Sequence, residues 1–323
     1  MKITLIGGSG FIGHSLALEL KQRGHEVTVI DSMAVNNLLT FLGNGDARYR
    51  SFIDERLALL HDAEIPQFIQ DARDYHALSR LLGSIQPDAI VHLAAVAHAG
   101  KSNKDPYSTF DHSLRTLENA LDYAKGKVSR FVYFSSSMVY GNFATESVTE
   151  DAPLNPIGIY GALKLAGELM VKAYGQVFDL PYVIVRPSAL YGPRCVSRRV
   201  LQVFIESALK GETLKVSDER IDFTYIDDLV AGVCLTLERS EAVGETFNLT
   251  YGEGRSVEDA AQIVCTSVEG PASAKYEYTD REAHAPKRGA LDVGKAKVAL
   301  GYSPHWPLER GLAKYLEWYR GRM

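Results

Sequence analysis

A tyrosine and a lysine four residues apart can carry acid–base chemistry in this chain. Tyr160 and Lys164 fall on one face of a predicted helix. A nearby ammonium group lowers the pKa of a phenol, so the tyrosine can take a hydroxyl proton while a hydride leaves the carbon. Tyr123 and Lys127 have the same spacing, which alone does not separate the two pairs. Because Gly126 interrupts the second pair where its helix should end, we interpret that pair as a solvated surface pair.

A run of serines upstream supplies a third candidate group. Residues 130–135 read as a buried strand, and Ser135, Ser136 and Ser137 lie at its end. Open α/β sheets bind ligands at the carboxyl ends of their strands, so a serine here can hydrogen-bond the hydroxyl that Tyr160 deprotonates. Serines at strand ends also satisfy turn backbone, and an isolated run would favour that structural role.

A glycine-rich turn near the start of the chain has the spacing G-x-x-G-x-x-G. Gly7, Gly10 and Gly13 join the first predicted strand to the first predicted helix. Such glycines allow a tight turn, close approach of the backbone to a pyrophosphate, and close helix–strand packing. The triplet alone would also suit a structural turn. Its place directly after the first strand, with an acid ending the second, favours a dinucleotide.

That acid, Asp31, indicates which dinucleotide. A carboxylate at this position accepts hydrogen bonds from the ribose hydroxyls of NAD and repels the 2′-phosphate of NADP. Ser32 and Met33 follow, so no adjacent arginine is available for that phosphate. The alternative is a strand-end aspartate that only caps a turn. The residues favour NAD.

The elements that would position these groups alternate between short apolar runs and helical patterns. Strand-like runs occupy residues 2–6, 26–30, 89–93, 130–135 and 182–185, and helical patterns occupy 11–23, 107–125 and 159–178. Near-continuous apolar runs suit strands buried on both faces of a parallel sheet. We therefore predict an α/β fold, a Rossmann-type doubly wound parallel sheet with right-handed crossovers.

The regular alternation of strand and helix patterns becomes weaker after residue 186, where glycines and prolines divide shorter elements. We divide the chain into an NAD-binding Rossmann domain, 1–186, and a smaller mixed α/β substrate-binding lobe, 187–323. Some later elements should return to the main sheet, and residues 223–226 are the candidates. Residues 32–65 read as a helical insertion whose purpose the sequence does not give.

Composition excludes several other classes of protein. The 323 residues are 46% hydrophobic and 23% charged, as in globular rather than disordered chains. A net charge of −5 gives no general attraction to nucleic acid or anionic lipid. The three cysteines, without a C-x-x-C pair, argue against a structural metal site and for a reducing compartment. Because no apolar run approaches the roughly 18 residues that span a bilayer and no secretory signal is evident, we expect a cytoplasmic protein.

Taken together, these motifs resemble the extended short-chain dehydrogenase/reductase family, in its branch of NAD-dependent nucleotide-sugar epimerases and dehydratases. The likeness runs from Gly7 to about Leu312. It rests on eight ordered motifs: Gly7-x-x-Gly10-Phe11-Ile12-Gly13, Asp71-Ala72-Arg73-Asp74, His92-Leu93-Ala94-Ala95, Ser135-Ser136-Ser137-Met138-Val139-Tyr140-Gly141, Tyr160-x-x-x-Lys164, Arg186-Pro187-x-x-x-Tyr191-Gly192-Pro193, Asp222-Phe223-x-Tyr225-x-Asp227-Asp228 and Leu300-Gly301-Tyr302-x-Pro304.

The resemblance implies a role for each matching position. Tyr160 would be the general base, Lys164 would bind the cofactor ribose and lower the pKa of the tyrosine, and Ser136 would assist at the sugar hydroxyl. Asp71 would meet the adenine, and Pro187 would lie near the nicotinamide. The implied cofactor-binding set is Gly7, Gly10, Phe11, Ile12, Gly13, Asp31, Ser32, Asp71, Ala72, Leu93, Ala94, Ala95, Tyr160, Lys164 and Pro187.

The same likeness separates reactions within the family. Related dehydratases have Asp-Glu after the catalytic hydroxyl residue, and related decarboxylases have the Glu, where this chain has Ser137 and Met138. Elimination and Glu-assisted decarboxylation are therefore disfavoured. What remains is oxidation at C4 of a nucleotide-diphosphate sugar, and a 4-epimerase is the leading hypothesis. The alternatives are a 4-dehydrogenase that releases the 4-keto sugar and a non-catalytic NAD-binding sensor or scaffold.

Several positions depart from the family pattern. His112 and Arg115 stand where many relatives have Asn and Gly, and His112 is either a site residue or a packed helix histidine. Ile221 replaces a family arginine, with Arg220 one place earlier.

A basic cluster after Pro193 is a candidate for binding the substrate diphosphate through bidentate hydrogen bonds, although a solvent-facing helix start would look the same. With the serine run, it gives the substrate-binding set Ser136, Ser137, Met138, Arg194, Arg199 and Arg288.

The family likeness also implies a homodimer. Helices at 107–125 and 159–178 would form a four-helix interface between the two copies. Leu114, Leu117 and Leu121 suit that interface and would equally face the chain's own sheet.

Overall fold

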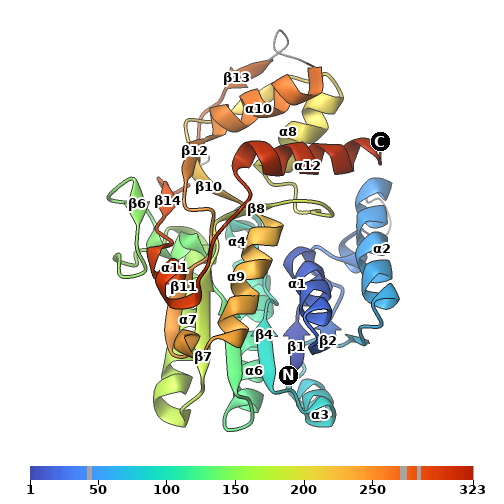
Figure 1. The fold of residues 1–323 in the computed structure, drawn as a ribbon, viewed down its shortest axis with the longest axis vertical. Coiled ribbons are helices and arrows are strands. Elements are labelled where there is room, and N and C mark those ends of the chain that lie inside the picture. Colours follow the sequence, from blue (N-terminus) through green and yellow to red (C-terminus); the bar gives the residue numbers. More distant parts are fainter. Residues whose placement is uncertain (42–45, 270–274, 282–284, 323) are drawn as a thin grey trace.

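The structure, a computed structural model, describes residues 1–41, 46–269, 275–281 and 285–322. Its centre is an all-parallel seven-stranded sheet in the order β11-β7-β5-β4-β1-β2-β3 (Figure 1). The chain winds outward from β1 in both directions, which confirms the predicted doubly wound α/β fold. The strands are β1 (Lys2–Ile6), β2 (Glu26–Asp31), β3 (Gln67–Ile69), β4 (Ala89–His92), β5 (Arg130–Phe134), β7 (Tyr182–Arg186) and β11 (Glu245–Asn248).

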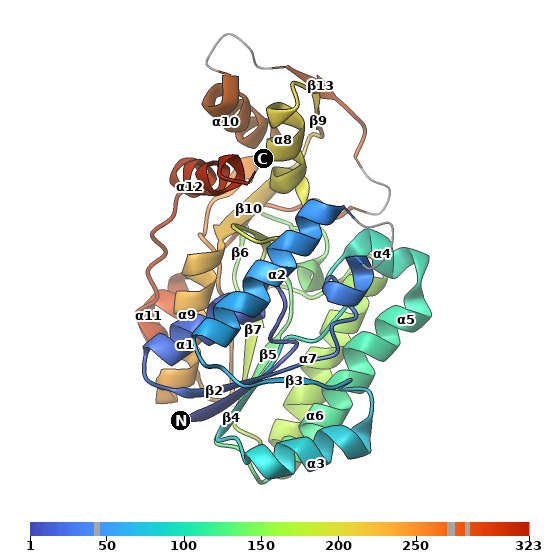
Figure 2. The same cartoon turned by 90° about the vertical axis from the view of Figure 1, so that its right-hand side faces the viewer.

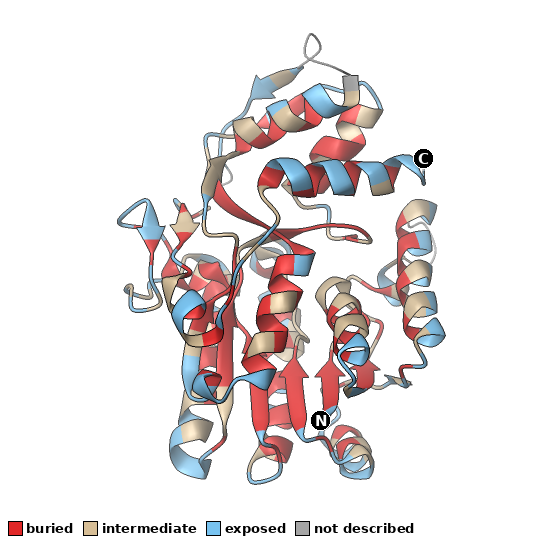
Figure 3. Ribbon diagram, viewed as in Figure 1, coloured by how far each residue is buried: buried red, intermediate tan, exposed pale blue. Residues whose placement is uncertain are grey.

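The central strands are buried on both faces, as their apolar runs predict. In β5, Phe131 and Tyr133 pack into one hydrophobic cluster and Val132 and Phe134 into the other, because successive side chains point to opposite faces. Figure 3 shows these buried strands between helices whose outer sides are exposed. One face is covered by α1 (Phe11–Gln22), α2 (Ala47–Asp62) and α9 (Ile226–Glu238), and the other by α3 (Tyr75–Ile85), α6 (Thr116–Ala124) and α7 (Gly158–Phe178) (Figure 2).

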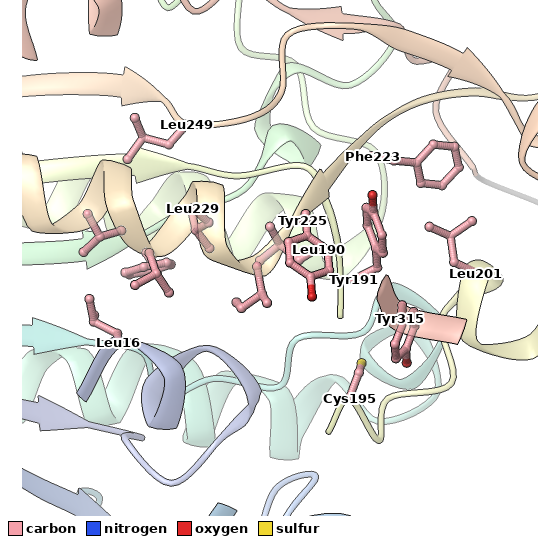
Figure 4. Packing of buried hydrophobic residues seen from close by; sticks show 14 of the residues in the cluster. Leu16, Leu190, Tyr191, Cys195, Leu201, Phe223, Tyr225, Leu229, Leu249 and Tyr315 are labelled. Atoms are coloured by element: carbon pink, nitrogen blue, oxygen red, sulfur yellow. The ribbon is translucent and has the colours of Figure 1, made fainter. Parts of the chain in front are cut away.

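A smaller lobe lies beyond the carboxyl ends of these strands, at the top of Figure 1. The core on the α1 face continues into it, from Leu16 through Tyr191 to Tyr315 (Figure 4). The lobe contains a sheet of β8 (Ala189–Tyr191), β10 (Arg220–Tyr225) and β12 (Gly254–Ser256), a pair of β9 (Leu214–Val216) and β13 (Tyr276–Tyr278), and helices α8 (Val200–Leu209), α10 (Val257–Glu269) and α12 (Leu308–Arg320). Shorter elements are β6 (Ser147–Val148), which pairs with β14 (Ala290–Leu291), α4 (Ala99–Lys104), α5 (Pro106–Phe110) and α11 (Gly294–Leu300).

The prediction that residues 223–226 return to the main sheet is wrong. Phe223 and Tyr225 belong to β10, which pairs with β8 on one side and β12 on the other. The strand that returns is β11, whose Thr246 pairs with Ile184 of β7. A short apolar run fits any open sheet edge, so its pattern alone does not select its partner.

The interpretation of residues 32–65 as an insertion is also wrong. Helix α2 is the crossover between the parallel neighbours β2 and β3, which such a fold requires. The helix also contacts the lobe. Phe52 packs against Trp318 and Tyr319 of α12, with ring centroids 4.6 and 5.7 Å apart, and the Tyr49 hydroxyl donates to Glu206 of α8 at 2.7 Å.

The segment predicted as one helix over 107–125 is helical but irregular. Helix α5 runs into a π-helical turn, Asp111–Arg115, and then into α6. Leu114, Leu117 and Leu121 are buried against the chain's own sheet rather than presented outward. Within the described ranges, none of the helices combines the length and apolar character that crossing a membrane demands.

The second tyrosine–lysine pair lies at the end of α6. Tyr123 is buried and donates to the Leu82 carbonyl at 2.8 Å, and the Lys127 ammonium lies 4.5 Å from the centre of its ring. The interpretation of a solvated surface pair is therefore wrong for Tyr123, which has a packing role.

Candidate active site

The glycine-rich loop connects β1 to α1 and lies against β2 and β4. The Gly7 N–H donates to the Ile30 carbonyl at 2.8 Å. A side chain at Gly13 would place its Cβ 2.5 Å from the Gly8 Cα, so only glycine lets the start of α1 lie this close to the loop. At Gly10 a Cβ would have one near neighbour, the Gly7 carbonyl at 3.3 Å. The backbone at Gly10 is thus open to a ligand at the positive end of a helix, where phosphates bind.

Asp31 ends β2 beside this loop. One carboxylate oxygen accepts the Ser9 N–H at 3.1 Å and the other accepts the Met33 N–H at 2.8 Å. Burial raises the pKa of Asp31, and the two backbone hydrogen bonds oppose that rise. Each oxygen keeps a lone pair for a further donor, such as a ribose hydroxyl.

A cavity, here called the cofactor cavity, runs from the loop past Asp31 to the ends of β3 and β4. It is lined by twelve of the residues predicted to bind the cofactor: Gly7, Gly10, Phe11, Ile12, Gly13, Asp31, Ser32, Asp71, Ala72, Leu93, Ala94 and Ala95. The structure therefore brings together residues from four separate segments of the chain, 7–13, 31–32, 71–72 and 93–95. The shape and the donors fit a dinucleotide such as NAD.

The far end of this cavity is ordered by an ion-pair network. Arg73 binds Asp71 at 2.6 Å and Asp111 at 2.9 Å, and its hydrogen bonds hold the pKa of Asp71 below its usual value. Asn119 donates to the Ala72 carbonyl at 2.8 Å. His112, left open between a site residue and a packed histidine, lines the cavity, where burial lowers its pKa and favours the neutral imidazole.

A second cavity, here called the substrate cavity, lies between the sheet and the lobe. Tyr160, Lys164 and Pro187 line it together with Ser136, Ser137 and Met138. The two cavities share a wall formed by Ile12, Leu93, Ala95, Ala97, Leu190 and Arg199. A dinucleotide in one and a sugar nucleotide in the other would therefore meet at this wall.

Tyr160 and Ser136 come together because α7 approaches the turn after β5 very closely. A Cβ at Gly161 would lie 2.7 Å from the Met138 carbonyl, so the glycine after Tyr160 permits the contact. Burial raises the pKa of Tyr160, while the charge of Arg199 and a hydrogen bond with Ser136 lower it. The chain thus supplies a cation and a hydroxyl that stabilise the phenolate.

Lys164 lies one turn further along α7. Its ammonium donates to the Phe134 carbonyl at 2.6 Å and lies 5.9 Å from the centre of the Tyr160 ring. Burial lowers the pKa of Lys164 to about 8. A lysine in this state gives up its proton more readily than an exposed one.

The middle of α7 is attached to the sheet by a buried ion pair that sequence reasoning missed. Arg186 of β7 makes two hydrogen bonds with Glu168, at 2.8 and 2.7 Å, and Ser135 donates to the same carboxylate at 2.5 Å. Glu168 lies four residues after Lys164, so this network fixes the helix that carries both candidate catalytic groups. Only the Arg-Pro motif at residue 186 gave a signal in the sequence.

The three serines after β5 have different partners. Ser135 binds Glu168, Ser136 caps the following turn by accepting the Met138 N–H at 3.2 Å, and Ser137 lies 3.4 Å from the Ser188 hydroxyl. No carboxylate side chain occupies positions 137 and 138 of this wall.

The predicted substrate arginines separate in the structure. Arg199 and Arg288 line the substrate cavity, and Glu219, which the sequence reading missed, lies 3.6 Å from Arg288. Arg194 lines neither cavity. It binds Glu55 at 3.1 Å and donates to His14 at 3.0 Å, on the α1 side of the fold.

The structure also shows where the other two departures from the family pattern lie. Ile221 is buried in β10, and Arg220 donates to the Gly254 carbonyl at 2.5 Å, so neither lines a cavity. Arg115 is exposed and pairs with Asp111 at 2.6 Å.

Comparison with known proteins identifies the family of this chain. The model of the NAD dependent epimerase/dehydratase family matches residues 3–250. An uncharacterized UDP-glucose epimerase, YtcB, from Bacillus subtilis (strain 168) is 32% identical, with 97% of this chain and 96% of the relative covered. A dTDP-glucose 4,6-dehydratase from Xanthomonas campestris pv. campestris (strain B100) is 30% identical, over 97% of this chain and 91% of its own length.

A solved structure shares the whole fold. The UDP-glucuronic acid 4-epimerase from Bacillus cereus, crystallised with UDP-glucuronic acid and NAD, superposes with a TM-score of 0.87 at 29% identity, over 99% of each chain. This chain therefore belongs to the NAD-dependent epimerase/dehydratase family, which confirms the resemblance, and its cofactor is NAD.

Proposed function

We propose that this chain is an NAD-dependent 4-epimerase of a nucleotide-diphosphate sugar. The observation that carries the proposal is that Tyr160, Lys164 and Ser136 together line the substrate cavity, which shares a wall with the cofactor cavity. A general base, a cation and a hydroxyl at one point are the groups that oxidation of an alcohol requires.

In this proposal Tyr160 takes the proton of the C4 hydroxyl while the C4–H bond breaks and the C4 ketone forms. When bound, NAD supplies the acceptor for the departing hydride and the donor for its return to the opposite face of C4. Tyr160 then gives its proton back to the new hydroxyl, so the reaction is redox-neutral overall. Ser136 orients the hydroxyl and Lys164 stabilises the phenolate.

The chemistry of the substrate cavity favours epimerisation over elimination. A dehydratase needs carboxylates to remove the elements of water, and the wall beside Ser136 offers Ser137 and Met138 instead. Arg199 and Arg288 supply positive charge for the diphosphate of the substrate.

The test compares two tyrosine variants that have the same Tyr-x-x-x-Lys context. Tyr160→Phe should lose about 10²- to 10⁴-fold in turnover, the usual contribution of a positioned proton acceptor. Tyr123→Phe, which removes the hydroxyl of a tyrosine that lines neither cavity, should keep turnover. Epimerisation of a panel of sugar nucleotides, followed by chromatography, provides the measurement. Near-normal turnover in Tyr160→Phe contradicts the proposal.

The same incubation separates the epimerase from a 4-dehydrogenase. An epimerase shows little net absorbance from reduced nicotinamide, because the hydride returns to the sugar. A dehydrogenase accumulates reduced cofactor and 4-keto sugar. NAD binding without conversion of any sugar nucleotide would instead favour the sensor or scaffold.

We further propose a homodimer that joins through α5 and α7. Tyr107 of α5 and Leu169 and Val177 of α7 are large apolar side chains left 83%, 61% and 68% exposed. Covering them would remove apolar surface from water. Light scattering on the native protein should give the mass of a dimer, and Leu169→Glu should shift it toward the monomer; a monomeric native protein contradicts the proposal.

A cytoplasmic location is also proposed. It is supported by Cys195, Cys234 and Cys265, which are buried and form no disulfide within the described part of the chain, as suits a reducing compartment. Fractionation of the producing cells, followed by immunodetection, tests it.

A further inference from the structure

A buried arginine of α2 lies in the wall of the cofactor cavity. Arg56 is 0% exposed and lines the cavity together with Asp31. Its Nε donates to the Arg194 carbonyl at 2.9 Å, and its Nη2 donates to the same oxygen. Its Nη1 has no hydrogen-bond partner among the residues that the structure describes.

The Nη1 group of Arg56 is therefore a charged hydrogen-bond donor without an acceptor among the described residues. A buried N–H without a partner costs roughly 1–3 kcal/mol, and more when the group is charged. Burial lowers the pKa of Arg56 to about 10, with the charge of Asp31 acting in the opposite direction. The carboxylate of Asp31 thus offsets the charge of Arg56 without a hydrogen bond to it. An acceptor oxygen at Nη1 would satisfy the remaining donor.

The position of Arg56 indicates which ligand brings that oxygen. The same cavity wall carries Gly10, open to a pyrophosphate, and Asp31, suited to a ribose. We propose that Arg56 is a cofactor-binding residue whose Nη1 donates to an oxygen of the adenosine diphosphate half of NAD. This inference rests on the NAD site assigned above and adds a residue from α2 to it.

Asp31 argues against a 2′-phosphate as the natural partner of Arg56. Its carboxylate lies in the same cavity and carries the charge that a 2′-phosphate would meet. A ribose hydroxyl or a pyrophosphate oxygen meets no such penalty, because the hydroxyl is neutral and the pyrophosphate lies at the loop.

Arg56 also links the cofactor to the substrate-binding segment. It holds the carbonyl of Arg194, whose φ of +64° begins the turn into residues 195–199. Val196 and Ser197 line the cofactor cavity, and Arg199 lines both cavities. A bound cofactor would therefore accept a hydrogen bond from Nη1 of Arg56, while Nε and Nη2 of the same side chain hold the start of this segment.

The experiment measures binding of NAD, ADP-ribose, AMP and adenosine to the full chain by titration calorimetry. Arg56→Met should weaken NAD binding about 10- to 100-fold, as expected for a lost charge-assisted hydrogen bond. Arg56→Lys should lose less, since it keeps the charge. If the loss extends to adenosine, the partner is a ribose hydroxyl; if it appears only with AMP and ADP-ribose, the partner is a phosphate.

Arg130→Met is the matched control. Arg130 is also a buried arginine, 8% exposed, whose Nη1 binds the carbonyls of Thr236 and Arg239 and whose Nε has no partner among the described residues. Arg130 is the first residue of β5, at the amino end of the strand and opposite the cavities, and it lines neither of them. Arg130→Met should therefore lose stability and keep the NAD affinity of the native protein.

Each outcome decides the question. If Arg56→Met folds and binds NAD within twofold of the native protein, the proposal is overturned. If Arg56→Met does not fold, Arg56→Lys carries the test, and unchanged NAD affinity there overturns it. If the native protein itself binds no NAD, the cofactor site fails, a result distinct from failure of Arg56 alone.

Discussion

Replacing Glu168 with glutamine should lower the free energy of unfolding by about 3 kcal/mol. The side chains of Glu168 and Arg186 are 0% and 2% exposed, so the change leaves a buried guanidinium without its counter-charge. Breaking such a pair from one side costs roughly 3–5 kcal/mol. We expect the lower end, because Arg186 keeps hydrogen bonds to the Tyr140 hydroxyl at 2.9 Å and the Glu150 carbonyl at 3.0 Å.

Chemical denaturation of the cofactor-free protein measures this loss. Glu118→Gln is the control, since Glu118 is an exposed carboxylate that accepts the Tyr174 hydroxyl at 3.0 Å between α6 and α7. Its replacement should cost at most about 1 kcal/mol. The double variant Glu168→Leu with Arg186→Met should recover much of the loss, because an apolar pair of similar volume often replaces a buried ion pair without penalty.

The reasoning is refuted if Glu168→Gln costs less than about 1 kcal/mol, or if the double variant is less stable than the single one. The first result would mean that α7 is held on the sheet by its apolar contacts alone, and the second that an apolar pair does not replace the polar network of Glu168 and Arg186. In the first case, the candidate catalytic residues would owe their placement to those apolar contacts.

Two further predictions concern the glycine loop and Lys164, the candidate catalytic lysine. Gly13→Ala should weaken NAD binding at least tenfold, as measured by calorimetry, because the new Cβ meets the Gly8 backbone at 2.5 Å. Gly83→Ala on α3, where a Cβ has nothing within 4 Å, should add up to about 1 kcal/mol of stability, as measured by denaturation. Equal effects of the two substitutions on NAD binding and on stability would contradict the prediction. Burial lowers the pKa of Lys164 to about 8 from 10.5. Between these values the unfolded chain keeps a proton that the folded protein has lost, so the native protein should gain stability relative to Lys164→Met as pH rises from 8 to 10. Unfolding curves that stay parallel over this range would exclude the shift.

Local patterns were enough to predict five strands of the seven-stranded central sheet. Strand β1 has the predicted bounds, and β2, β4, β5 and β7 differ by one residue at one end. These strands are buried on both faces, so every residue reports the same preference for an apolar environment. The glycine spacing succeeded for a similar reason, since tight contacts such as Gly13 against Gly8 exclude any side chain.

These local patterns do not predict which distant segments of the chain pair with one another. The sequence does not identify β11 as the strand that returns, because Phe247 is its one apolar residue and the choice of partner depends on distant edges. Arg194 and Arg199 lie in one basic cluster, yet only Arg199 lines a cavity. Arg56 sits in a charged helix where nothing local marks it as buried.

The contact between α2 and α12 limits how the cleft can open. The rings of Phe52 and Trp318 pack together across the two halves, Glu55 binds Arg322 at 2.8 Å, and the Tyr49 hydroxyl donates to Glu206. Swinging the lobe away as a rigid body would separate these rings and leave the Glu206 carboxylate without that hydroxyl. Entry and exit of the sugar nucleotide should therefore depend on local motion of the segments that line the cavities, with the α2–α12 side remaining closed throughout turnover.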